Sequence, residues 1–149
     1  MKLALSQSGS GALARLRSLG ADGLLMLAVS VILLPMVDVA IRWAGWRRTC
    51  RVLRKFVPVA PKKIANDIDI QRLSAIVQIA ATRSPWRATC LRQAVALWFL
   101  LALRGVECDL RIGIADRTDA GLDTHAWLEH DGIVLIGGET SPARYRVMV

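Results

Sequence analysis

The chain has 149 residues, a length that suits one domain or a small domain with a helical preface. Apolar residues make up 54% of it, which permits a real hydrophobic core and excludes wholesale disorder. The three cysteines cannot all pair, so their count favours free thiols in a reducing compartment. No C-x-x-C motif occurs, and both histidines lie far along the chain from Cys50 and Cys90, so we expect no zinc site.

The net charge of +8 is spread unevenly. Residues 1–63 carry 11 Lys and Arg against Asp22 and Asp38, whereas residues 64–149 carry 9 against 10 Asp and Glu. A basic segment attracts nucleic acid, an anionic membrane or an acidic protein. No nucleic-acid motif and no basic stripe interleaved with aromatics is present, so nucleic acid is not an expected partner.

The first elements are apolar and then basic. Residues 1–10 are expected to be frayed, and a helix could begin within 13–19. The apolar run 23–37 lacks a signal-peptide cleavage site and lasts only about 15 residues before Asp38, short of the roughly 20 that a bilayer requires. Pro35 is also expected to kink it. We therefore favour a buried or partner-facing helix over a membrane span.

A basic amphipathic helix is predicted over residues 39–56, with a possible break at Gly45. Its apolar residues recur at steps of three and four, and arginines fill the other side. The apolar positions are Val39, Trp43, Trp46, Cys50, Leu53 and Phe56. The favoured interpretation is a helix packed on the domain with its arginine face in solvent. The alternative is a docking surface for a partner or a membrane.

The second half of the chain predicts two helices and then strands. After a proline-rich linker at 58–63, a helix is expected over 67–83, capped by Asp67 or Asp69 and ended by Ser84-Pro85. Its apolar stripe comprises Ile70, Leu73, Ile76, Val77 and Ala80. The remaining expectations are a helix over 90–104 ending at Gly105, a strand over 109–115, a loop at 117–121, and a hairpin of strands 124–130 and 133–136 around Asp131-Gly132.

Cys90 is placed where a nucleophile would be expected. With Thr89 as the helix N-cap, Cys90 lies in the first turn, where free N–H groups and the helix dipole favour a thiolate and can hold an oxyanion. The alternative is a buried structural cysteine, which is common. Cys50 and Cys108 have no comparable position.

A cysteine nucleophile needs a base, usually histidine, and a group that orients it. Along the strand 124–130, His125, Trp127 and Glu129 share one face, and His130 lies on the other beside the turn. We choose His125 as the base, against the alternative of a structural histidine.

The orienting carboxylate has three candidates, each of which could equally be an ordinary solvated charge. They are Glu139 after the hairpin, Asp131 in the turn and Glu129 on the histidine's own strand. Glu129 reaches the imidazole poorly, because its side chain runs parallel to it. Glu139 falls slightly beyond the residue paired with His125, a gap that Gly137-Gly138 could absorb, and we prefer it.

Taken together, these motifs resemble the transglutaminase-like cysteine peptidases, which are related to papain in architecture. The resemblance covers about residues 70–146 and rests on the cysteine helix from Cys90, the strand L110-R-I-G-I and the hairpin H125-A-W-L-E-H-D-G. The fuller strings resemble one branch, the stand-alone leader peptidase of lasso-peptide biosynthesis. The resemblance implies an α+β fold in which the cysteine helix packs on a small antiparallel sheet. A basic helical region, 1–63, would precede a peptidase domain, 64–149.

The resemblance also implies a function. The enzyme would remove the leader from a ribosomally made precursor in the cytoplasm, without metal or organic cofactor. Its partners would be the precursor and a separate small leader-recognition protein, with the lasso cyclase as a further candidate and membrane contact less expected. Cys90 would be the nucleophile, His125 the general base and acid, and Glu139 the orienter, although the family often has Asp there. The alternatives are a transglutaminase-type acyltransferase or amidase, and a non-enzymatic membrane-associated adaptor.

Overall fold

The computed structural model describes residues 20–57, 66–83, 89–118, 121–138 and 141–148. Its elements are α2 (Gly20–Ala44), α3 (Trp46–Arg54), α4 (Asp67–Arg83), α5 (Cys90–Ala102), β1 (Asp109–Thr118), β2 (Gly121–His130), β3 (Ile133–Ile136), α6 (Ser141–Arg144) and β4 (Arg146–Val147). The predictions for the frayed start, the helix at 13–19, the linker 58–63, the stop at Ser84-Pro85 and Glu139 lie outside the described residues.

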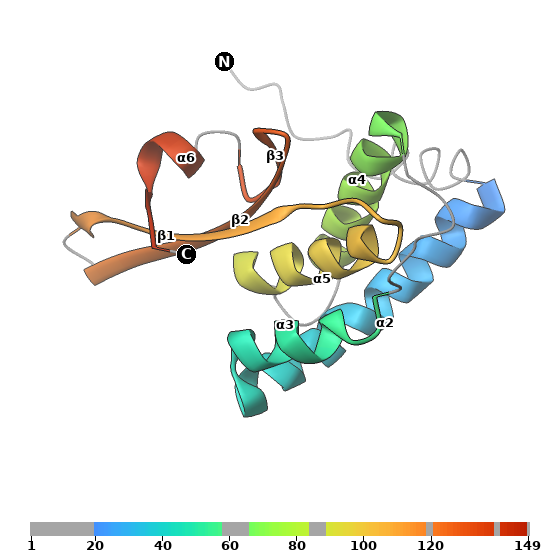
Figure 1. Cartoon of the computed structure of the whole chain (residues 1–149), viewed down its shortest axis with the longest axis horizontal. Helices are drawn as coiled ribbons and strands as arrows, with labels where there is room; N and C mark the ends of the chain where they lie inside the picture. The colour runs from blue at the N-terminus through green and yellow to red at the C-terminus, as the bar shows by residue number, and fades with distance from the viewer. Residues whose placement is uncertain (1–19, 58–65, 84–88, 119–120, 139–140, 149) are drawn as a thin grey trace, which may run out of the picture.

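The molecule is built in layers (Figure 1). The antiparallel sheet, in the order β3-β2-β1-β4, packs one face on α4 and α5. On the other side of these two helices lie α2 and α3. This arrangement confirms the predicted α+β class, with a cysteine-bearing helix against a small antiparallel sheet. The division at residues 63 and 64 stays a prediction, although α2 shares its core contacts with α4 and α5.

Helices α4 and α5 supply most of the core. The predicted stripe of α4 is buried, and α5 is buried on most of its sides because the sheet covers one face and α2 another. The cap of α4 differs from the prediction. The side chain of Asn66 accepts a hydrogen bond from the N–H of Asp69 at 2.9 Å, because Asn66 occupies the position just before the first helical residue. The prediction that Asp67 or Asp69 caps the helix is therefore wrong.

The sheet is a long hairpin with two short additions. Strands β1 and β2 extend further than the predicted 109–115 and 124–130, so that most of the predicted loop at 117–121 is strand. The predicted turn is present, and both Asp131 and Gly132 have positive φ, of 48° and 77°, as a two-residue hairpin turn requires. The short helix α6 and strand β4 were not predicted.

Strand β3 contains an irregularity that affects the site. His130 pairs with Ile133 and Glu129 with Val134, but Leu128 pairs with Ile136, so that Leu135 is an extra residue in the strand. The carbonyl of Leu135 accepts a hydrogen bond from the buried Ser74 hydroxyl of α4. This contact holds the bulge against the helix layer.

Helix α2 is longer than the sequence suggests. It runs for 25 residues through Pro35 and Asp38, so the argument that the apolar run is too short for a bilayer is wrong. Asp38 does not end the helix because its charge is compensated: its Oδ1 lies 2.6 Å from Arg92 of α5 and 3.0 Å from Arg42. Among the described residues, α2 is the one helix long and apolar enough to cross a membrane, and 28% of its most apolar window is buried in the protein.

Gly45, with φ of 77°, separates α2 from α3, as the sequence suggested. The favoured interpretation of this region, a helix packed through its apolar face, is only partly correct. Leu53 and Cys50 pack on the core, but Trp43 is 88% exposed and Phe56 67% exposed. Trp43 lies on the open face of α2, and Phe56 follows the end of α3.

Candidate active site

Cys90 is the first residue of α5, and its side chain is half-buried. Thr89 occupies the N-cap position in an extended conformation, with ψ of 160°, and its carbonyl accepts the N–H of Gln93 at 3.1 Å. The Thr89 hydroxyl makes no capping hydrogen bond, so it does not take up the N–H groups of the first turn. Those groups and the helix dipole favour negative charge at this end of the helix.

His125 lies near the middle of β2 and is held on several sides. Its Nε2 lies 2.5 Å from the carbonyl oxygen of Gly137, just after β3. Its ring stacks on Tyr145 at 5.0 Å between centroids and on Trp127 at 6.3 Å. Because a carbonyl only accepts hydrogen bonds, Nε2 carries the proton, and Nδ1 of the neutral ring is an unprotonated acceptor. The ring is thus fixed in the tautomer that a general base requires.

Two glycines make room for this arrangement. Gly113 of β1 is directly opposite His125, and a Cβ there would lie 2.8 Å from Cβ of Tyr145 and 2.9 Å from the Trp127 ring. A Cβ on Gly137 would lie 2.5 Å from Cβ of Trp127 and 2.8 Å from its Cα. The first glycine admits the aromatic rings to the sheet face, and the second lets the chain after β3 approach β2 closely.

Tyr145 connects the histidine with an acid. Its hydroxyl donates a hydrogen bond to Asp123 at 2.9 Å. The pKa of Tyr145 lies above its usual value, first because of this hydrogen bond, then because of burial and the negative charges of Asp123 and Cys90, while Arg144 acts in the opposite direction. The phenol that stacks on His125 is therefore held in place by Asp123 and stays protonated.

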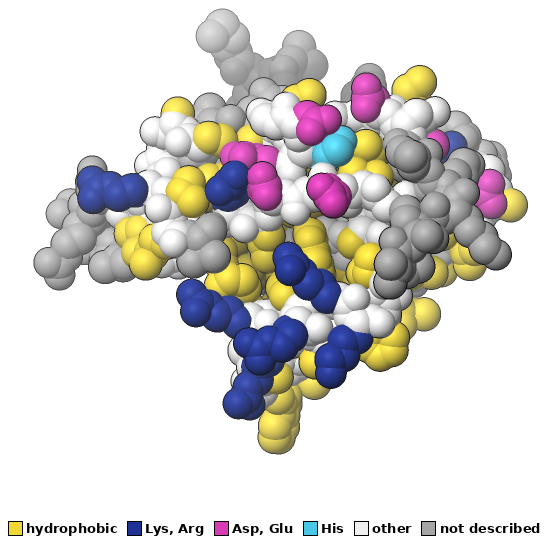
Figure 2. Space-filling view, in the orientation of Figure 1, with side chains coloured by type: hydrophobic (Ala, Val, Ile, Leu, Met, Phe, Trp, Pro, Cys, Tyr) yellow, Lys and Arg dark blue, Asp and Glu magenta, His cyan; other side chains and the backbone are white. Residues whose placement is uncertain are grey.

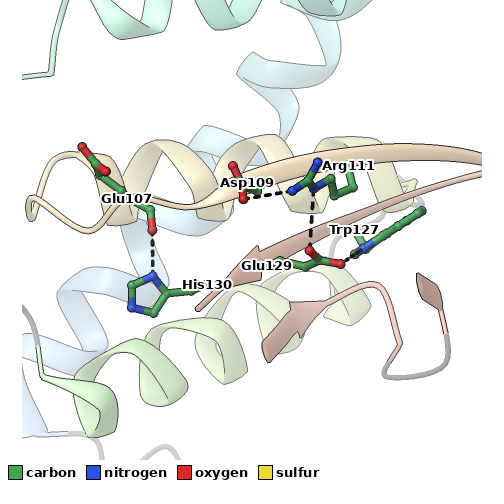
Figure 3. Close-up of polar contacts among 6 residues, drawn as sticks. All are labelled: Glu107, Asp109, Arg111, Trp127, Glu129 and His130. Atoms are coloured by element: carbon green, nitrogen blue, oxygen red, sulfur yellow. Dashed lines mark hydrogen bonds and ion pairs between the residues drawn. The ribbon is translucent and has the colours of Figure 1, made fainter. Parts of the chain in front are cut away.

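The orienting group of His125 in the described structure is a backbone carbonyl. Two of the candidate acids are engaged elsewhere, and Figure 3 shows one of them, Glu129, with its partners. Glu129 accepts a hydrogen bond from the Trp127 indole at 2.6 Å and lies 3.6 Å from Arg111. Asp131 is in the turn, 3.5 Å from His130. Glu139 lies outside the described residues, so its assignment stays a prediction.

The other cysteine and histidine of this region form a separate environment. The Nδ1–H of His130 donates a hydrogen bond to the Glu107 carbonyl at 2.7 Å, on the side away from the Trp127–Glu129 contact (Figure 3). Cys108 lines the same groove as His130, but burial, Asp109 and Asp131 raise its pKa to about 12. Cys108 is therefore held as a thiol and is unsuited to be a nucleophile.

Burial also raises the pKa of Cys50, although Arg54 lowers it in part. Three contributors to the site were not predicted from the sequence: Asp123, the carbonyl of Gly137, and Tyr145. Asp123 had a usable signal, since strand alternation places it on the same face as His125. Tyr145 had none, because it reaches the site from the far end of the chain.

The family model of the transglutaminase-like superfamily matches residues 31–149. The match begins inside α2 and includes both Cys90 and His125. Neither the search of curated proteins nor that of solved structures found a significant match.

Proposed function

Because the chain belongs to the transglutaminase-like superfamily, we propose that it is a cysteine peptidase that removes the leader peptide from a lasso-peptide precursor. The superfamily includes cysteine peptidases and acyltransferases, which share a thiol nucleophile and an acyl-enzyme step. The observation that carries the proposal is the fixation of His125 by the Gly137 carbonyl and two aromatic rings, on a strand that packs against the helix beginning with Cys90.

In the proposed first step, Nδ1 of His125 accepts the thiol proton of Cys90, and the thiolate attacks the carbonyl carbon at the leader–core junction. Backbone N–H groups at the start of α5 stabilise the oxyanion, in the manner of other acyl-transfer enzymes. The protonated imidazole then protonates the leaving amine of the core peptide. Water, activated by the neutral imidazole, hydrolyses the thioester, which releases the leader carboxylate and restores the thiol.

Tyr145 and Asp123 have a supporting role in this proposal. The stacked phenol limits rotation of the His125 ring, and the hydrogen bond to Asp123 fixes the phenol in turn. Both are positioning residues, since neither is assigned to touch the substrate.

The choice of a lasso precursor rests on the combined strings from Cys90, Leu110 and His125, which resemble that branch of leader peptidases. The free amine released from the core would then be available to a separate cyclase. Within the proposal the enzyme acts in the cytoplasm together with a small leader-recognition protein.

Two experiments test the chemistry. Cys90→Ala should abolish cleavage of a lasso precursor supplied with its leader-recognition protein, while the matched Cys108→Ala cleaves normally. Mass analysis of the products separates hydrolysis, which gives two fragments, from acyl transfer to an added amine, which gives a ligated product. Retained cleavage by Cys90→Ala would exclude the mechanism, and a ligated product would favour the acyltransferase alternative.

A substrate-free measurement isolates the pairing of thiol and imidazole. Alkylation of Cys90 by iodoacetamide, followed by mass spectrometry, reports its thiolate fraction. His125→Ala should slow this reaction several-fold near neutral pH, whereas His130→Ala should leave it unchanged. Equal rates in the wild type and both variants would remove the dyad from the proposal.

A further inference from the structure

Helix α2 carries an apolar face that the described protein leaves uncovered. Seven large apolar side chains on it are between 47% and 88% exposed. They are Leu24, Leu25, Val31, Ile32, Met36, Val39 and Trp43, and we call them the α2 stripe. At 100° per residue they fall within a sector about 140° wide, and at 1.5 Å per residue they extend over about 30 Å. The stripe is therefore one continuous surface along the whole helix.

Between Leu24 and Val39 no exposed charge interrupts the stripe. The one charged residue there is Asp38, which is buried at the border of the buried face, and Arg42 is the first exposed charge in the sector of the stripe. Ser30, Leu34 and Val37 are buried on that same face against the rest of the protein. The two faces of α2 thus have different roles, since one joins the core and the other is apolar and open.

Positive charge gathers at the C-terminal end of the stripe. The exposed cations there are Arg42, Arg47, Arg48, Arg51, Arg54 and Lys55, which we call the basic cluster. Figure 2 shows Lys and Arg side chains gathered over α3 and Asp and Glu side chains toward the sheet. The next acidic residue after Asp38 is Asp67. Trp43, the most exposed residue of the stripe, lies where the apolar surface meets the charges, the position that tryptophan favours at a bilayer interface.

The contacts of the buried face oppose a transmembrane orientation. Asp38 and Arg92 are only 11% and 15% exposed, and their oxygen and nitrogen lie 2.6 Å apart. To cross a bilayer, α2 would leave α4 and α5, carry Asp38 into lipid and leave Arg92 without this carboxylate. That loss opposes insertion strongly. An orientation in the plane of the interface needs no such change.

We propose that the α2 stripe and the basic cluster form a surface that docks the folded protein on a bilayer containing anionic phospholipid, with α2 lying in the plane of the membrane. The apolar stripe enters the boundary between headgroups and acyl chains, and the basic cluster contacts the headgroups. A second copy of this chain would bring the same positive charge to the surface, whereas an anionic bilayer supplies the opposite charge. This inference is independent of the peptidase activity.

The test is co-sedimentation of the full chain with vesicles. The protein should bind vesicles of phosphatidylcholine and phosphatidylglycerol, bind pure phosphatidylcholine much more weakly, and be released by high salt or alkaline carbonate. Ile32→Ser with Met36→Ser should reduce the partition coefficient by about tenfold or more, because two apolar side chains no longer enter the lipid. The matched control is Ile68→Ser, since Ile68 is 77% exposed on α4 and lies outside the stripe.

A second set of variants tests the contribution of the basic cluster to vesicle binding. Arg47→Glu with Arg51→Glu should reduce binding roughly tenfold at low salt, and Arg146→Glu on β4 should not. All of these positions are exposed, so circular dichroism and the unfolding midpoint should stay at wild-type values. Equal loss in the stripe and control variants overturns the proposal. The proposal is also overturned if the protein forms a dimer through the stripe and does not bind vesicles. Binding that resists alkaline carbonate would overturn it too, because it would indicate a spanning helix.

Discussion

Gly137 combines a backbone conformation and a close contact that only glycine can satisfy. Its φ of 106° is unfavourable for any L-residue, at a cost of about 1–2 kcal/mol. A Cβ there would lie 2.5 Å from Cβ of Trp127, about 1 Å inside ordinary carbon–carbon contact. Trp127 is fully buried and cannot move aside freely, so overpacking adds about 1–3 kcal/mol. Gly137→Ala should therefore destabilise the protein by about 2–5 kcal/mol.

Gly132→Ala is the matched control, because Gly132 also has a positive φ, of 77°, but a Cβ there meets nothing within 4 Å. Gly132→Ala should therefore lower the free energy of unfolding by only the cost of the positive φ, about 1–2 kcal/mol. Equilibrium urea unfolding followed by circular dichroism measures both values. Gly137→Ala should also slow Cys90 alkylation, since its carbonyl would leave Nε2 of His125, whereas Gly132→Ala should not. Equal stability of the two variants would refute the packing argument.

Three further predictions use the same unfolding assay. Ser74→Ala should cost about 1–2 kcal/mol, because the Leu135 carbonyl loses its hydroxyl partner, and an unchanged stability would mean that the bulge needs no support from α4. Asp38→Asn should cost about 3 kcal/mol, because the largely buried Arg92 loses the charge of the Asp38 carboxylate; a loss under about 1 kcal/mol would show the pair to be weak. The folded state raises the pKa of Cys108 from 9.0 to about 12, so its contribution to stability is complete below pH 9 and is lost as pH rises from 9 to 12. The free energy of unfolding of Cys108→Ala should fall less than that of the wild type between pH 9 and 12. Identical pH profiles of the two proteins would contradict the raised pKa of Cys108.

What the sequence predicted well depends on short-range physics. The stripe of α4, the break at Gly45 and the Asp131-Gly132 turn each follow from residues a few positions apart. The position of Cys90 at a helix start follows from local pattern in the same way.

What the sequence did not reveal depends on distant contacts. The bulge at Leu135 is held by Ser74, 61 residues earlier. Helix α2 passes Asp38 because Arg92, on another helix, compensates its charge. Tyr145 joins His125 only because Gly113 leaves space on a neighbouring strand. No periodicity in the chain encodes these pairings, so the supporting residues of the candidate site remained hidden while Cys90 and His125 could be proposed.

The ion pair between α2 and α5 has a practical consequence for anyone who wishes to shorten this protein. Arg92 lies two positions after Cys90. The helix that begins with the thiol is therefore held by Asp38 of α2, a helix that a truncation of the basic N-terminal region would remove. A fragment that begins after the proline-rich stretch 58–63 would lack α2 and would expose the core residues of α4 and α5 that α2 covers. We expect such a fragment to aggregate, and we expect the smallest autonomous unit to include α2.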